Sequence, residues 1–281
     1  MKKSIIFLCA ATLLLASCDK ITPADDGTYT VFAGISATWS DGDNVTPVQH
    51  ALVEKFTGPK CPNCPEADIT LEAAHALLGE QLIVISVNHP VGQGVPFPGD
   101  PDLRCDDGTT WDNYYGINAI PSAFINRDRS KQYSGQMSAI TADLQSALTE
   151  SPVLGLAVSA DSTADGTGID VSVSLQFEQQ VDAPLTLTLA LIEDSLAYRQ
   201  SHGENVVEGY MHNHMLRDVL TDVWGAEVDA DGTAGERRKA TFGTYHLKDT
   251  SIKLKNCHIV AFVSDRASKR VLNSASCKIA D

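Results

Sequence analysis

Residues 51–87 contain a strand-like run, a pair of cysteines, a helical pattern and a second strand-like run, and this succession constrains the fold strongly. "ALVEKF", residues 51–56, predicts a short strand. The apolar residues of "CPNCPEADITLEAAHALLG" recur at helical spacing and predict a helix that Gly79 ends. "LIVISV", residues 82–87, is typical of a parallel strand buried on both faces. Together they predict a βαβ unit with a right-handed crossover.

The stretch "EKFTGPKCPNCPEA" places Cys61 and Cys64 between the first strand and the helix. The pair could be a redox centre, a metal clip or a structural disulfide. Zinc would need distant ligands, because the next cysteine lies 41 residues further on and no second CxxC exists. A redox pair needs its first cysteine at a helix N-terminus, where free N–H groups stabilise a thiolate. Here Pro62 suits the first helical position and Lys60 adds positive charge, which favours redox chemistry.

The N-terminus predicts export and lipid attachment. Two lysines precede an apolar stretch that is too short to span a membrane, and together they predict a signal peptide over residues 1–17. The stretch ends in "LLASC", which is similar to a bacterial lipobox, so we expect Cys18 to be lipidated after cleavage. We therefore expect membrane attachment through this N-terminal lipid only.

Export to an oxidising compartment lets disulfides persist. Loss of Cys9 and lipidation of Cys18 leave five cysteines, an odd number. Cys257 and Cys277 flank two strand-like runs whose midpoint falls in "DRASK", so a symmetric hairpin would place them opposite each other and Val263 opposite Val271. This symmetry predicts a structural Cys257–Cys277 disulfide.

Two further groups of chemistry-bearing residues lie outside the CxxC stretch. Cys105 falls in a long loop after the second strand, where it could resolve a mixed disulfide, cap the site or be a lone thiol. His212 and His214 form an H-x-H pair, with His202 as a weak third ligand. Such histidines are more often structural, and we assign no metal site.

The net charge of the mature chain limits the classes of molecule that it can bind. Removing the signal peptide leaves 19 basic against 36 acidic residues, a net charge near −17. This balance argues against nucleic acid and anionic lipid surfaces. We expect the partners to be protein thiols or disulfides, or a surface ligand, and we expect no cofactor, because a dithiol is itself a redox group.

The chain divides into three regions that differ in their pattern of polar and apolar residues. Residues 18–50 are expected to form a lipidated tether and N-terminal extension. Residues 51–150 carry the βαβ pattern and further α/β elements. Residues 151–281 contain about seven short runs with alternating polarity, such as "IDVSVSLQF" and "LTLTLAL", and predict an antiparallel β-sandwich.

Residues 51–150 resemble the thioredoxin superfamily in the order and length of their expected elements, and "CPNC" looks like the CPxC variants of that superfamily. Ile120-Pro121 matches its cis-proline and Gly135 the glycine before its last helix. The resemblance implies that Cys61 is the nucleophile, that Cys64 resolves the mixed disulfide and that Pro121 shapes a peptide-binding edge.

One position departs from the thioredoxin pattern. Where thioredoxins carry a buried acid, six residues before the first cysteine, this chain has Lys55, with Glu54 beside it. Either Glu54 takes the role of the acid or the proton relay is absent. The departure puts fast dithiol reduction in doubt more than disulfide exchange itself.

A narrower resemblance rests on the lipobox, "EKFTGPKCPNCPEA" and "GYMHNHMLRDVLTDVWG". Together these are similar to outer-membrane lipoproteins of about twenty-eight kilodaltons from Bacteroidetes, in which an immunoglobulin-like β-domain follows a thioredoxin-like one. The resemblance implies lipid anchoring at the outer membrane. The leading hypothesis is thiol–disulfide exchange on exported or surface proteins. The alternative is a non-enzymatic adhesin or antigen with an inert Cys61–Cys64 disulfide.

Overall fold

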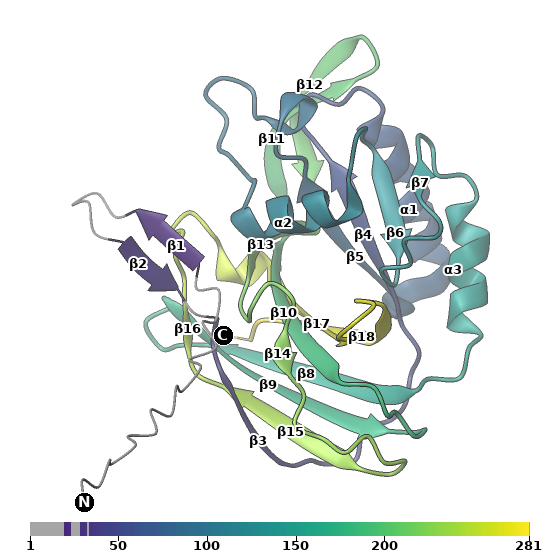
Figure 1. Ribbon diagram of the computed structural model, residues 1–281. Coiled ribbons are helices and arrows are strands. Elements are labelled where there is room, and N and C mark those ends of the chain that lie inside the picture. The colour runs from purple at the N-terminus through teal and green to yellow at the C-terminus, as the bar shows by residue number, and fades with distance from the viewer. Residues whose placement is uncertain (1–19, 24–28, 33, 281) are drawn as a thin grey trace, which may run out of the picture. The chain divides into compact units, whose positions relative to one another are not determined.

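The computed structural model describes residues 20–23, 29–32 and 34–280 (Figure 1). Residues 1–33 and 34–281 form two separate compact units. In the first unit, β1 (Lys20–Pro23) pairs antiparallel with β2 (Tyr29–Phe32). The expected signal peptide and the lipidation site Cys18 lie outside the described residues. The second unit contains the remaining helices and strands.

The predicted βαβ unit is confirmed. It comprises β4 (Ala51–Thr57), α1 (Cys64–Leu78) and β5 (Leu82–Asn88), which runs parallel to β4. Both strands are buried along their whole length, as the continuous apolar run of β5 predicts for that strand. Gly79 ends α1 with a positive φ of 61°, a conformation that glycine adopts without steric cost.

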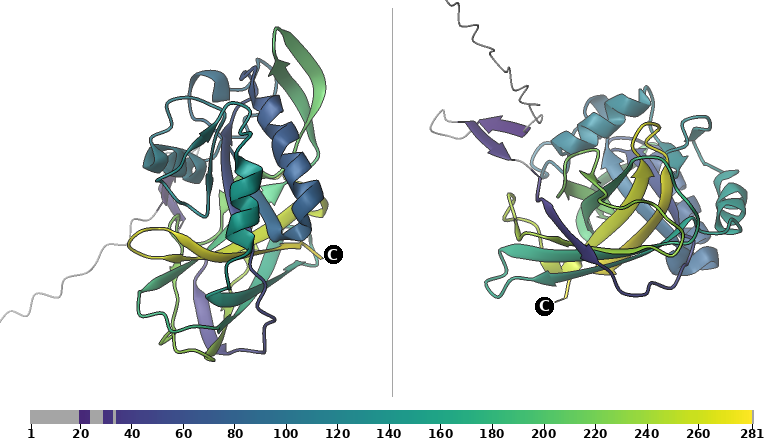
Figure 2. Two further views of the ribbon diagram at one scale, coloured as in Figure 1. Left: turned by 90° about the vertical axis from the view of Figure 1, so that its right-hand side faces the viewer. Right: turned by 60° about the horizontal axis from the view of Figure 1, so that its bottom comes forward.

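Four further elements extend this unit: α2 (Asp106–Tyr115), β6 (Ser122–Ile125), β7 (Tyr133–Ser134) and α3 (Ile140–Leu148). β6 pairs antiparallel with β4, and β7 pairs antiparallel with β6. The strand order in this part is therefore β5-β4-β6-β7. α1 and α3 contact each other and cover one face of these strands (Figure 2, left).

Strands from the C-terminal half continue the same sheet: β10 (Leu185–Glu193), β13 (Met215–Val219), β17 (Cys257–Asp265) and β18 (Val271–Lys278). The order is β18-β17-β10-β13-β5-β4-β6-β7, and the short β14 (Ala226–Glu227) also pairs with β10. The junction is a parallel pairing of β13 with β5 through Met215 and Ser86. One nine-stranded mixed sheet thus runs through both halves.

A separate antiparallel sheet has five strands: β3 (Ala37–Asp41), β8 (Leu154–Ser162), β9 (Gly168–Phe177), β15 (Arg237–Phe242) and β16 (Tyr245–His246). β3 brings part of the N-terminal extension into this sheet by pairing with β15. The hairpin β11 (Leu196–His202) and β12 (Asn205–His212) belongs to neither sheet.

Three apolar cores surround the mixed sheet. On β10, Leu187 and Leu189 pack against the five-stranded sheet, whereas Ala190 and Ile192 face the core that contains Trp111 of α2. A third core lies between β4, β5, β6 and the helices α1 and α3. Hence one face of the mixed sheet carries α2, and the other carries α1 and α3 at one end and the antiparallel sheet at the other. The expected combination of an α/β part with an antiparallel β part is confirmed at this level.

The predicted β17–β18 hairpin is present, but its predicted register is wrong. Val263 lies opposite Asn273, and Cys277 lies opposite Ile259 instead of Cys257. The turn closes between Asp265 and Arg270, and a bulge after Val263 shifts the pairing further. Cys257 and Cys277 are therefore not opposite each other, and both are thiols in the structure.

The thiols of Cys257 and Cys277 should react slowly with alkylating reagents. Burial raises the pKa of the Cys257 thiol to about 12 and that of Cys277 to about 11, from 9.0. Because the thiolate is the reacting species, we expect iodoacetamide at pH 8 to label them roughly 100- to 1,000-fold more slowly than an ordinary thiol. Unfolding in urea without reductant should expose both to rapid labelling. Peptide mapping that finds them linked in unreduced protein would contradict the structure.

Candidate functional site

A disulfide joins Cys61 and Cys64 in the loop that connects β4 to α1, with their Cα atoms 5.5 Å apart. The loop is tightly turned, since Cys61 N–H donates to the Gly58 carbonyl at 3.0 Å. The two cysteines are 0% and 1% exposed. The sequence thus located the bonded pair, but it gave no indication that both cysteines would be covered.

The helix begins at Cys64, two residues after Pro62, which was expected to occupy the first helical position. Pro65 explains the difference. In a helix that began at Cys61, Pro65 would lie beyond the first positions, where its missing N–H and its ring would disrupt the bond to the carbonyl four residues earlier. Pro65, not Pro62, therefore occupies the first helical turn.

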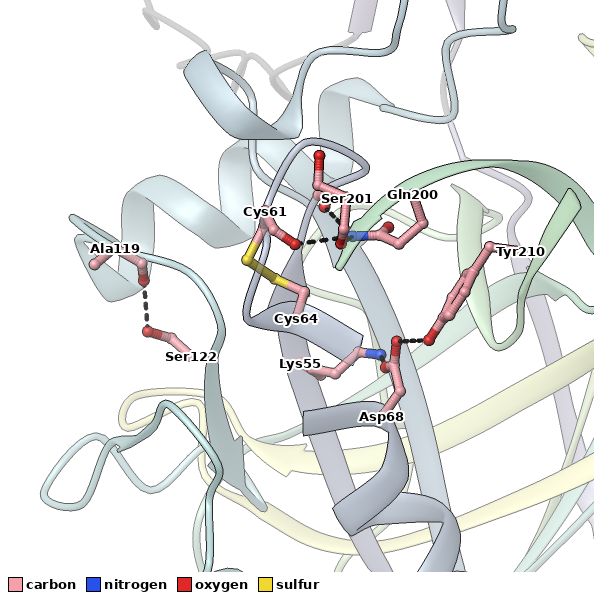
Figure 3. Close-up of a disulfide and its surroundings, with 10 residues drawn as sticks. Lys55, Cys61, Cys64, Asp68, Ala119, Ser122, Gln200, Ser201 and Tyr210 are labelled. Carbon is pink, nitrogen blue, oxygen red and sulfur yellow. Dashed lines mark hydrogen bonds and ion pairs between the residues drawn. A yellow bond between two sulfur atoms is a disulfide. The ribbon is translucent and has the colours of Figure 1, made fainter. Parts of the chain in front are cut away.

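The segment Ala119–Ser122 lies on the side of the disulfide toward which the sulfur atoms point (Figure 3). The Ile120–Pro121 peptide bond is cis. Because Ser122 pairs with Phe56, Pro121 comes next to the end of β4, where the cysteine loop starts. The hydroxyl of Ser122 donates to the Ala119 carbonyl at 2.7 Å and fixes this turn. The structure therefore brings Pro121 to the cysteine loop.

The β11–β12 hairpin covers the other side of the loop (Figure 3). Ser201 N–H donates to the Pro59 carbonyl at 2.8 Å, and Gly203 N–H donates to the Pro62 carbonyl at 3.0 Å. The buried side-chain amide of Gln200 donates to the Cys61 carbonyl at 2.9 Å. The contact between Gln200 and Cys61 was not predicted from the sequence, because it joins residues about 140 positions apart.

Lys55 points to the α1 side of the sheet and forms an ion pair with Asp68. Asp68 lies one helical turn after Cys64, and Tyr210 of β12 donates to its other oxygen at 2.8 Å. Burial and the nearby Asp68 carboxylate raise the pKa of Tyr210. The carboxylate of Asp68 on α1 therefore lies beside Lys55, the strand position at which thioredoxins carry a buried acid.

A cavity of about 160 Å³ opens beside this ion pair. Lys55 and Asp68 line it together with Glu72, His75 and His214, and neither cysteine is among the lining residues. Lys60, which was expected to add charge near Cys61, directs its ammonium toward the Phe97 ring, 5.6 Å from the centroid.

Glu54 cannot replace the missing acid. Successive residues of a strand point to opposite faces, so Glu54 faces away from α1 when Lys55 faces toward it. Its carboxylate is fully buried and binds Arg127, with Nη2 to Oε1 at 2.8 Å, and it also accepts a hydrogen bond from Tyr115. The assignment of Glu54 to the cysteine site is therefore wrong. The period of two in β4 could have excluded it.

Cys105 caps α2: its sulfur accepts a hydrogen bond from Gly108 N–H at 3.4 Å. It packs against the Trp111 core, on the face of the sheet opposite α1. The structure thus gives Cys105 a place in the helix cap and does not bring it to Cys61.

Two histidines of the H-x-H hypothesis have separate acidic partners, whereas the buried Nε2 of His212 has no hydrogen-bond partner in the described ranges of the chain. His202 contacts Glu66 at 3.0 Å, and His214 lies 3.4 Å from Asp194. Burial lowers the pKa of both His212 and His214. Among the residues that the structure describes, no group of His, Cys, Asp and Glu has the arrangement of a metal site.

Residues 108–281 match the family described as outer membrane protein Omp28, and the chain belongs to this family. The expected resemblance to that lipoprotein family is thereby confirmed, as is the expected location of a lipoprotein at the outer membrane. No curated protein matches the chain. In the described part of the chain, no helix has the length and apolarity needed to cross a membrane.

Several solved structures are similar to this chain, and two of them come from Porphyromonas gingivalis. HBP35 of Porphyromonas gingivalis matches with a TM-score of 0.63 at 16% identity, covering 84% of this chain and 77% of its own. A domain of the outer membrane lipoprotein Omp28 from Porphyromonas gingivalis matches at 22% identity with a TM-score of 0.31, covering 46% of this chain and 89% of its own. The first shows that the mixed α/β fold is shared with HBP35.

Proposed function

We propose that this lipoprotein exchanges thiols and disulfides with exported or surface proteins through Cys61 and Cys64. One observation carries the proposal: the disulfide joins the loop after β4 to the first residue of α1, beside the segment that contains Pro121 (Figure 3). An N-terminal helix end favours a thiolate, and a CxxC pair closes a disulfide within one turn.

We also propose that residues 51–150 form a thioredoxin-like region and residues 151–281 an immunoglobulin-like sandwich. The strand order β5-β4-β6-β7, with β4 and β5 parallel and the other pairs antiparallel, supports the first assignment. The core between the five-stranded sheet and β10, β17 and β18 supports the second.

In the reductive direction, the Cys61 thiolate attacks a substrate disulfide and forms a Cys61–substrate bond, and the leaving sulfur departs as a thiolate that takes a proton. The Cys64 thiolate then attacks the Cys61 sulfur, restores the intramolecular disulfide and releases the second substrate thiolate. The substrate gains two electrons and this protein loses two. The same steps in reverse would oxidise a dithiol.

The test is disulfide exchange by the reduced protein on insulin, compared with Cys61→Ser. We expect the wild type to accelerate insulin reduction by dithiothreitol and Cys61→Ser to abolish the acceleration, because the nucleophile is gone. Cys277→Ser, which changes a thiol away from the loop, should retain it. Equal rates for the wild type and Cys61→Ser would contradict the proposal.

A second candidate function is that of a non-enzymatic surface binding protein, in which Cys61–Cys64 is a structural disulfide. The burial of both cysteines favours it, since an exchanging sulfur must be reached by its substrate. The reduction potential of the pair separates the two functions. A value below about −300 mV would identify a structural disulfide, whereas a value in the range of disulfide oxidoreductases would support exchange.

A further inference from the structure

The β11 strand contacts the cysteine loop as an added strand would. Ser201 N–H in β11 and Gly203 N–H in the turn that follows it are two residues apart and bind the carbonyls of Pro59 and Pro62. Alternate N–H groups along one edge are what an extended peptide offers when it joins a backbone edge. The loop carbonyls therefore form a ready acceptor row for an extended chain.

Three acidic side chains lie under the hairpin, which meets them with basic and hydroxyl groups, while Lys60 of the loop directs its ammonium toward the Phe97 ring. Arg199 binds Asp100 at 3.0 Å, His202 binds Glu66 at 3.0 Å, and Tyr210 donates to Asp68. The hydrogen bond from Arg199 holds the pKa of Asp100 below its usual value. A chain that replaced β11 would have to supply cationic groups at the same places.

The contacts that hold the hairpin are mostly polar and partly solvated. The His202–Glu66 pair is about 40% exposed on both sides, and exposed ion pairs contribute little to stability. Val206, Val207 and Met211 of β12 face solvent. The apolar contacts lie at the hairpin base, in a small cluster of Leu103, Leu196 and Met215 with Tyr198. Such an element opens locally at a low free-energy cost compared with the sheet.

We propose that the carbonyl row of residues 58–62, together with Glu66 and Asp100, binds an extended basic peptide segment that carries a cysteine, and that β11 occupies this surface until the segment displaces it. The proposal deepens the exchange function and rests on it for the chemical step. It explains how a disulfide that is buried in the structure becomes reachable by a protein substrate, because displacement of β11 removes the hydrogen bonds that hold the cysteine loop in place.

The first test measures how strongly the β11–β12 hairpin protects the Cys61–Cys64 disulfide from reduction, and it does not require catalysis. Oxidised protein is treated with dithiothreitol, quenched with iodoacetamide, and analysed for labelled Cys61 and Cys64 by mass spectrometry. We expect Arg199→Ala and Ser201→Pro to accelerate reduction about tenfold or more, since each removes a contact that holds the hairpin. Val206→Ala, on the solvent side of the hairpin, should react as the wild type does.

Amide hydrogen exchange in β4 and β5 would verify that each variant keeps the sheet intact. Should Ser201→Pro fail this check, Arg199→Ala and the milder Gln200→Ala provide the measurement. Reduction rates within twofold of the wild type in all the folded variants would overturn the proposed cover. Acceleration would support it whether or not the protein catalyses insulin reduction, so failure of the exchange function remains distinguishable.

The second test measures the peptide preference. Reduced Cys64→Ser protein reacts with two nine-residue peptides, one Lys-rich and one Glu-rich, each with its cysteine activated as a mixed disulfide with thionitrobenzoate. Cys61 attack transfers the peptide to the protein and releases the coloured thiolate. We expect the Lys-rich peptide to react about tenfold faster at low salt and the advantage to fall with added salt.

The double variant Glu66→Gln/Asp100→Asn should lose most of the preference, and Glu80→Gln, which changes an exposed acid beyond the end of α1, should keep it. Equal rates for the two peptides would overturn the proposed surface. As a measurement independent of chemistry, the same two peptides with serine in place of cysteine are compared for binding to oxidised Arg199→Ala by fluorescence anisotropy. Tighter binding of the Lys-rich peptide would support the surface, and equal binding would overturn it.

Discussion

Replacing Glu54 with leucine should lower the free energy of unfolding by about 3–5 kcal/mol, because it leaves the Arg127 guanidinium buried without its carboxylate. Both side chains of this ion pair are 1% exposed. The guanidinium also lies 4.6 Å from the ring centroids of Trp111 and Phe262. These rings exclude water and cannot replace a full negative charge. Denaturant unfolding at neutral pH gives the measurement.

Two controls make the result specific. Arg270→Gln breaks an ion pair with Asp128 that is 55% and 33% exposed, and it should cost less than about 1 kcal/mol. The double variant Glu54→Leu/Arg127→Met should recover much of the lost stability, since it removes both buried charges. A Glu54→Leu cost as small as that of Arg270→Gln would show that the buried pair does not stabilise the native state.

A fragment of residues 51–150 should not fold on its own. The apolar core that contains Leu52, Phe56, Ile85 and Trp111 also contains residues from the C-terminal half, and without that half part of this core would face water. β5 would also lose its partner β13 and become an exposed edge.

We expect the 51–150 fragment to lack a cooperative thermal transition and near-ultraviolet circular dichroism, whereas residues 34–281 should show both in a single transition. A sharp transition in the fragment, with dispersed amide resonances, would mean that the thioredoxin-like region is autonomous. The division at residue 150 would then mark an independent domain.

The elements that could be predicted from the sequence are those that depend on local pattern. The continuous apolar run of β5 predicted a parallel strand buried on both faces, and Gly79 predicted the end of α1. The alternation in "LTLTLAL" was misleading. It suggested one solvent-facing side, yet Thr186 and Thr188 of β10 are buried along with the leucines. Polarity alternation reports side-chain chemistry, and here both faces meet other layers of the fold.

The cysteine pair and Pro121 were predictable as neighbours because a known pattern ties them together. The partners of the charged residues were not. Lys55 pairs with Asp68, Glu54 pairs with Arg127, and the Gln200 amide binds the cysteine loop from a segment far along the chain. Each pairing depends on which face of the sheet a residue occupies and on which distant strands adjoin it. Single-sequence periodicity carries the first kind of information and not the second.

The hairpin leaves the sheet from β10 and returns to it at β13, and these two strands are antiparallel neighbours. A tight turn would suffice to join such a pair. The sheet therefore places few demands on the length or composition of residues 194–214. For an engineer, this excursion is an exchangeable module: its tip, which contacts the cysteine loop, can be redesigned while the strands that carry it stay as they are.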